Sequence, residues 1–160
     1  MLNNQFILLA EDDPNDVLLI ERAFQKAGMG QLLKIVRDGE EAIAYLSGEG
    51  RFARREHFPE PFLLLLDLKM PGADGFEVLR WVRTEPQTKR LLVVVLTSSN
   101  LQADVDRAYD LGANSYLVKP VSFDEMVNMI RRFEAYWTEI NRIPTNPGAA
   151  VPAAAETTLG

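Results

Sequence analysis

The sequence of 160 residues contains no cysteine, which excludes disulfide bonds and thiolate metal sites and suits a reducing compartment. It also lacks any apolar stretch approaching the roughly 20 residues that a membrane-spanning helix needs. The first apolar run begins at Phe6, too early for a signal peptide to precede it. We therefore expect a cytoplasmic protein with no membrane partner.

Basic residues are also scarce, since 17 Lys and Arg stand against 23 Asp and Glu, for a net charge of -6. This balance argues against nucleic-acid binding through bulk electrostatics. The apolar content of 47% with 25% charged residues is ordinary for a globular protein. The shortage of basic residues thus argues against nucleic acid as a partner and does not limit the fold.

Short apolar runs alternate with helical patterns along the chain. The runs cover residues 6–10, 32–36, 62–66, 91–96 and 115–118. The helical patterns cover 15–27, 40–46, 75–85, 101–111 and 122 to about 142, the first of them opened by Asp13-Pro14. Such alternation predicts an α/β fold with a parallel sheet covered on both faces. We expect one domain over residues 1–143, followed by a disordered tail, 144–160, rich in Pro, Ala and Gly.

Polar side chains stand where the expected strands end. Glu11 and Asp12 follow the first strand, Asp67 the third, Thr97 the fourth and Lys119 the fifth. In a parallel sheet these positions converge on one edge, where ligands of α/β proteins bind. Crowded carboxylates raise one another's pKa unless a cation compensates them, and Mg²⁺ prefers oxygen ligands. Lys119 and Thr97 suit phosphate oxygens, which makes Asp67 a candidate nucleophile that forms an acyl phosphate.

Each of these residues also has an ordinary structural explanation. Asp67 could cap a helix, but the next helical pattern begins several residues later. Glu11 and Asp12 could favour a helix N-terminus by their charge, Lys119 could be a surface lysine, and Thr97 could cap the following helix. The coincidence at four separate strand ends favours a shared site.

Taken as a set, these motifs resemble the receiver domain of two-component response regulators over about residues 6–140. The matching segments are Glu11-Asp12, Asp67 with Met70-Pro71-Gly72, Asp74-Gly75, Thr97-Ser98 and Tyr116-Leu117-Val118-Lys119-Pro120. The resemblance implies a flavodoxin-like, doubly wound, five-stranded parallel sheet of order 2-1-3-4-5 with five helices. It also implies that Asp67 takes a phosphoryl group from the phosphohistidine of a partner histidine kinase, with Mg²⁺ bound.

The resemblance further implies a role for each metal-site residue. Asp12 and Asp67 would bind the metal through their side chains, Glu11 through a water molecule, and Lys69 through its backbone carbonyl.

Two more roles follow from the resemblance. Thr97 and Tyr116 match the family's switch pair, in which the phosphoryl group draws the hydroxyl inward and the aromatic ring follows. The alternative for Tyr116 is an ordinary aromatic residue of an edge strand. Lys119-Pro120 matches the family's cis peptide, which would aim the lysine.

The sequence departs from a plain receiver in two places. The segment 48–61 is long and charged, and it contains His57, which we interpret as a loop residue rather than a phosphorelay site. The final helix has a wider apolar surface than one face needs. Its last turns, with Tyr136, Trp137, Ile140 and Ile143, should project beyond the domain and, with Phe133, mark a protein contact. The alternative is packing against the chain's own N-terminus or tail.

Both departures are similar to single-domain regulators paired with phytochrome-type histidine kinases, several of which dimerise. We therefore expect a phytochrome-type kinase as partner and consider a homodimer through the C-terminal helix. The expected output is a protein–protein surface around the fourth helix, fifth strand and fifth helix.

Other functions compete with that of a terminal phosphoacceptor, which is not an enzyme in the usual sense. A phosphorelay intermediate would pass the phosphoryl group to a histidine phosphotransfer protein. A haloacid-dehalogenase-like phosphatase would need a second Asp two residues after the nucleophile, where this chain has Lys69. A constitutive interaction module with an inert pocket would not need the complete set of acids and lysine.

Overall fold

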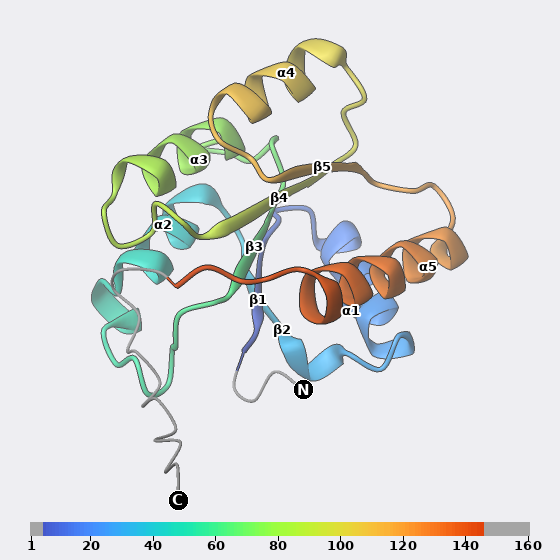
Figure 1. The fold of residues 1–160 in the computed structure, drawn as a ribbon, viewed down its shortest axis with the longest axis horizontal. Coiled ribbons are helices and arrows are strands. Elements are labelled where there is room, and N and C mark those ends of the chain that lie inside the picture. Colours follow the sequence, from blue (N-terminus) through green and yellow to red (C-terminus); the bar gives the residue numbers. More distant parts are fainter. Residues whose placement is uncertain (1–4, 146–160) are drawn as a thin grey trace, which may run out of the picture.

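The computed structural model describes residues 5–145, and these contain the five parallel strands that the sequence predicts. The strands are β1 (Ile7–Ala10), β2 (Leu33–Val36), β3 (Leu63–Leu66), β4 (Leu92–Thr97) and β5 (Ser115–Val118). Their order in the sheet is β2-β1-β3-β4-β5, which confirms the flavodoxin-like topology (Figure 1). Most of the tail expected at 144–160 lies outside the described residues.

Helices cover both faces of the sheet (Figure 1). They are α1 (Pro14–Lys26), α2 (Gly39–Ser47), α3 (Gly75–Thr84), α4 (Gln102–Asp110) and α5 (Phe123–Glu134), with short 3₁₀ turns η1 (Gly30–Leu32) and η2 (Gly50–Phe52) and a π-helical segment η3 (Ala135–Ile140). Side chains of α1 and α5 join one core, and side chains of α2, α3 and α4 join the other. None of the described helices is long and apolar enough to span a membrane.

The central strands are continuous apolar runs because both of their faces are buried. In β1, Leu8 and Ala10 belong to the core under α2 and α3, whereas Ile7 and Leu9 belong to the core under α1 and α5. The same alternation runs through β3 and β4. This packing fixes the register of the central strands, and with it the position of the residues that follow them.

Helix starts differ along the chain. At α1, as predicted, the Asp13 carboxylate accepts the backbone N–H of Asn15 at 2.8 Å, and Pro14 takes the first helical position. Asp74 caps α3 in the same way. At α4, which lies entirely within the described residues, the capping position is Leu101, whose apolar side chain makes no capping hydrogen bond.

The segment between α2 and β3 is more firmly attached than its composition indicates. Arg55 donates hydrogen bonds to the carbonyls of Tyr45 (2.7 Å) and Phe58 (3.1 Å), which ties the segment to the end of α2. The rings of Phe52 and Phe58 pack edge to face, with centroids 5.2 Å apart. His57 is exposed in a turn of this segment, in keeping with its interpretation as a loop residue.

The C-terminal helix differs from the prediction. Instead of running straight to about residue 142, α5 changes at Ala135 into π-helical η3. Trp137 is only 9% exposed and packs into the core under α1 and α5, together with buried Phe133. The prediction that Trp137 projects beyond the domain is therefore wrong. Burying a large indole surface favours a local change of helix geometry over a regular helix that would expose it.

The end of the described chain also folds back onto the domain. Ile143 is half-buried against the same core as Trp137, so it does not project either. Beyond it, the Arg90 guanidinium donates to the carbonyl of Thr145 at 3.2 Å. Only Tyr136 and Ile140 of the expected contact remain exposed, at 49% and 70%.

Candidate functional site: carboxylates and a lysine at the carboxyl edge of the sheet

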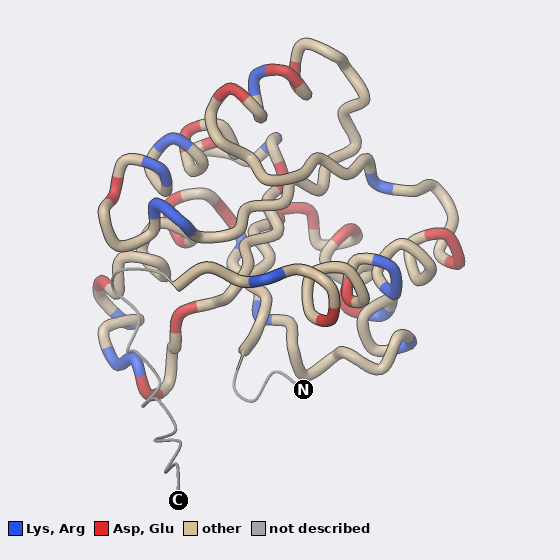
Figure 2. The backbone as a smooth tube through the Cα atoms, viewed as in Figure 1, with Lys and Arg blue, Asp and Glu red and all other residues tan. Residues whose placement is uncertain are grey.

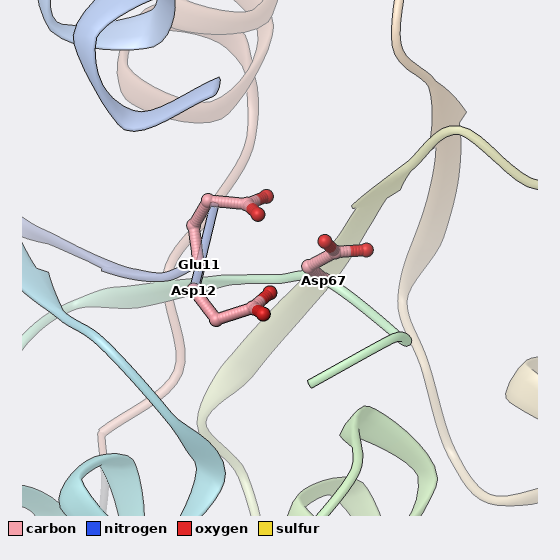
Figure 3. A group of neighbouring side chains, drawn as sticks. All are labelled: Glu11, Asp12 and Asp67. Carbon is pink, nitrogen blue, oxygen red and sulfur yellow. The ribbon is translucent and has the colours of Figure 1, made fainter. Parts of the chain in front are cut away.

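Three carboxylates gather where β1 and β3 end (Figure 3). The register pairs Ala10 with Leu66, so Glu11 and Asp67 follow side by side. The Asp67 backbone N–H donates to the carbonyl of Ala10 at 3.1 Å and continues the pairing. One carboxylate oxygen from each of Glu11, Asp12 and Asp67 lies within 4.8 Å of the others. The sheet thus brings together the three acids that the sequence singled out, and Figure 2 shows the acidic stretch that joins β1 to α1.

Lys119 reaches this cluster from the end of β5. Its backbone N–H donates to the carbonyl of Thr97 at 2.7 Å, which extends the pairing of β4 and β5. Its ammonium nitrogen lies 2.6 Å from Glu11 Oε2, 2.9 Å from Asp16 Oδ2 and 3.2 Å from Asp67 Oδ2. The predicted acids and lysine therefore form one connected site.

Asp16 is a member of this site that the sequence analysis missed. It lies in the first turn of α1, where its side chain faces Lys119. An acidic residue in a first turn ordinarily needs no explanation beyond the helix dipole. The sequence signal was therefore present but not specific.

Burial and charge shift the ionisation of the site. Burial raises the pKa of Glu11 to about 7, although the hydrogen bond from Lys119 opposes the shift. Burial lowers the pKa of Lys119, but hydrogen bonds to Glu11 and Asp16 and the charge of Asp67 outweigh it and raise the pKa above its ordinary value. Lys119 therefore stays cationic, and the acids still outnumber it. An oxygen-only, anionic donor set of this kind fits a divalent cation.

Thr97 and Tyr116 are linked through Ser99. Thr97 is fully buried at the end of β4, and its hydroxyl accepts the backbone N–H of Ser99 at 3.5 Å. The Tyr116 hydroxyl donates to the Ser99 carbonyl at 2.9 Å. Burial raises the pKa of Tyr116, since it disfavours the phenolate. The Ser99 hydroxyl donates to Asp104 of α4 at 2.6 Å, so one residue connects the site to that helix.

The predicted cis bond between Lys119 and Pro120 is wrong, because every peptide bond among residues 5–145 is trans. The trans form of an X–Pro bond is favoured by about 0.5–1 kcal/mol. With this trans bond the Lys119 ammonium already reaches the carboxylates. Lys69 is exposed, and its backbone N–H lies 3.5 Å from Asp67 Oδ1. The role of the Lys69 carbonyl as a metal ligand stays a prediction.

Gly75 also supports the site. A β-carbon built at Gly75 would lie 2.3 Å from the backbone oxygen of Asp67, closer than real contacts allow. The Gly75 N–H donates to the Leu68 carbonyl at 3.0 Å. The start of α3 can therefore lie directly against the loop after β3 only because this residue has no side chain.

Comparison with known proteins agrees with this geometry. Residues 7–131 match the family described as response regulator receiver domain. Over 138 residues the chain is 38% identical to response regulator Rcp1 of Synechocystis sp. (strain PCC 6803), covering 86% of this chain and 92% of the relative. Two solved structures are also similar to this fold.

The first of these is the response regulator RPA3017 in red light signaling of R. palustris, with a TM-score of 0.84 at 36% identity, covering 89% of this chain and 99% of that one. The second is the Mn(2+)-bound form of response regulator Rcp1, with a TM-score of 0.77 at 37% identity, covering 88% and 99%. The fold, the similarity in sequence and the geometry of the site thus all indicate the same family.

Proposed function

The chain belongs to the family of response regulator receiver domains, and we propose that Asp67 is the side chain on which it accepts a phosphoryl group from a histidine kinase. The convergence of Asp67, Lys119 and Thr97 on one edge of the sheet carries this proposal. The Asp67 carboxylate attacks phosphorus, and the bond from phosphorus to the histidine nitrogen of the kinase breaks. Lys119 and Thr97 then offer an ammonium and a hydroxyl to the phosphoryl oxygens.

The metal of this site is proposed to be Mg²⁺. Asp12 and Asp67 would hold it through their carboxylates, Lys69 through its backbone carbonyl and Glu11 through a water molecule. Hard oxygen donors favour Mg²⁺ among common cellular cations, and Mg²⁺ supplies positive charge to phosphoryl oxygens. Support comes from the three carboxylates within 4.8 Å of one another.

Signalling is proposed to run from Thr97 through Tyr116 to the surface formed by α4, β5 and α5. The hydrogen bond from Tyr116 to the Ser99 carbonyl, and that from Ser99 to Asp104, supply a physical connection. A phosphoryl oxygen that draws the Thr97 hydroxyl would disturb its contact with the Ser99 N–H. The change would then reach α4, which few buried contacts hold.

The partner is proposed to be a phytochrome-type kinase in the cytoplasm, because similar solved proteins include a regulator in red light signaling.

The protein is also proposed to form a homodimer through its C-terminal helix. Exposed Tyr136 and Ile140 support it, together with a groove of about 490 Å³ on α5 and η3 lined by Met129, Phe133 and Trp137. Sedimentation tests the dimer. We expect Tyr136→Ala and Ile140→Ala to weaken it without unfolding the protein, since these exposed side chains contribute little to folding. A wild-type monomer would contradict it.

Labelling with radioactive acetyl phosphate and Mg²⁺ tests the phosphoacceptor. We expect up to one acid-stable, base-labile phosphoryl group per wild-type chain and none on Asp67→Asn. Asp106→Asn, which neutralises an exposed acid on α4, should label like the wild type. Equal labelling of wild type and Asp67→Asn would contradict the assignment. Steady turnover of a generic phosphate ester would indicate a phosphatase instead.

A further inference from the structure

Asp16 contacts the site without belonging to the proposed metal ligands. Its carboxylate lies 2.9 Å from the Lys119 ammonium, closer than that of Asp67 at 3.2 Å. The acids that could share a metal ion are Glu11, Asp12 and Asp67, and Asp16 is not among them. Asp16 is thus an acid that contacts Lys119 but has no role in the proposed phosphoryl transfer.

The ammonium of Lys119 is fully occupied. An ammonium carries three N–H donors, and three carboxylates accept from it, those of Glu11, Asp16 and Asp67. Any phosphoryl oxygen that Lys119 binds must therefore displace one of these partners. Which of them is displaced depends on the cost of leaving it unpaired.

Exposure decides between the candidates. The Glu11 side chain is 1% exposed, so without the lysine it would remain buried and unpaired, at a high cost. Phosphorylation of Asp67 at Oδ1 leaves Oδ2 as a carbonyl oxygen, which can still accept from the ammonium. The Asp16 side chain is 38% exposed, so water can replace the lysine at its carboxylate. Asp16 is therefore the partner that Lys119 releases most easily.

We propose that Asp16 is a positioning residue that holds the Lys119 ammonium in the unphosphorylated protein and releases it to a phosphoryl oxygen when Asp67 is phosphorylated. The inference rests on the proposed function of Asp67. Since Asp16 competes with the phosphoryl group for the Lys119 ammonium, it weakens binding of the phosphoryl group. Asp16 thus destabilises the phosphorylated state relative to the unphosphorylated one.

Binding of beryllofluoride, which mimics the phosphoryl group on an aspartate, tests this in saturating Mg²⁺. We expect Asp16→Asn to tighten binding about fivefold, the upper range for a partly exposed ion pair. Asp16→Glu should restore wild-type affinity. Glu21→Gln removes the same charge elsewhere on α1 and should leave the affinity unchanged. In a Lys119→Met background the effect of Asp16→Asn should shrink to that of the control.

A readout without metal complements the binding assay. In the chelator-treated protein the Lys119 ammonium should give a slowly exchanging ¹⁵N–¹H resonance, and Asp16→Asn should broaden or remove it. If wild type fails to bind beryllofluoride, both the proposed function and this inference fail. If wild type binds and Asp16→Asn binds equally tightly, only the role of Asp16 is overturned. An effect that persists in the Lys119→Met background would also overturn it, because Asp16 would then act by its charge alone.

Discussion

The helices α1 and α4 both begin at the carboxyl edge of the sheet, yet they are held very differently. The carboxylate of Asp13 caps α1, which buries Val17, Ile20, Ala23 and Phe24. Throughout α4, all of which is described, only Ala108 is buried, and no side chain caps its start. Figure 1 shows α1 beside α5 and α4 at the outer margin of the fold. The site therefore lies between one firmly packed helix and one lightly held helix.

This asymmetry suits a protein that must keep its site while changing its surface. Elements with few buried contacts open and shift at low cost. Asp67 and Lys119 belong to the rigid part, since Asp67 follows the fully buried strand β3 and the buried Glu11 carboxylate holds the Lys119 ammonium. Ser99 connects that part to Asp104 on α4. A small change in the site can thus become a larger movement in the helix that burial restrains least.

Truncating one aromatic side chain on each helix should expose the difference most strongly. Phe24 of α1 is fully buried, and Phe24→Ala should lower the free energy of unfolding by about 3–5 kcal/mol, because it leaves a cavity. Tyr109 of α4 is 50% exposed, and Tyr109→Ala should change it by less than about 0.5 kcal/mol. Urea denaturation measures both. Similar losses for the two variants would refute the contrast between the helices.

The free energy of unfolding should also depend on pH, through Glu11 at the start of the loop that leads into α1. Burial raises the pKa of Glu11 from 4.5 to about 7, so the folded protein holds a proton that the unfolded chain releases. The stabilisation is complete below pH 4.5 and is lost as the pH rises through 7, by on the order of 2–3 kcal/mol. Urea denaturation at pH 5 and pH 8 in a chelator measures this loss.

Two variants separate the contribution of Glu11 from that of other acids. Glu11→Gln keeps a neutral side chain at every pH, so its stability should fall less between pH 5 and pH 8 than that of the wild type. Asp110→Asn, an exposed acid of α4, should leave the wild-type difference intact. If Glu11→Gln retains the full pH dependence, the proton resides elsewhere.

The sequence predicts this site well wherever strands position the residues. Glu11, Asp67 and Lys119 follow strands, and Thr97 ends one. The carboxyl ends of these strands must meet in a parallel sheet, so the convergence of the four residues needs no knowledge of side-chain packing. Asp16 could not be found in this way, because its contact depends on how α1 rotates against the sheet.

The two errors have different causes. A straight helix would carry Trp137 outside the domain, whereas the change to π-helical geometry at Ala135 accompanies burial of the indole. The isomer of the Lys119–Pro120 bond was taken from the resemblance. An X–Pro sequence permits both isomers at similar energy and so does not decide between them.

A cap added to α4 is the smallest and most direct change to the asymmetry. Leu101 already has the extended backbone of a capping residue, with φ −69° and ψ 127°, and its side chain is 61% exposed. Leu101→Ser should therefore stabilise α4 by about 1 kcal/mol, and Asp13→Ala should destabilise α1 by a similar amount. Amide hydrogen exchange should slow about fivefold in α4 of the first variant.

Since the signal is proposed to end in α4, Leu101→Ser should also reduce the beryllofluoride-induced NMR shifts in α4 and leave those at Asp67 unchanged. Undiminished shifts in a demonstrably stabilised α4 would mean that the looseness of this helix is not what transmits the signal.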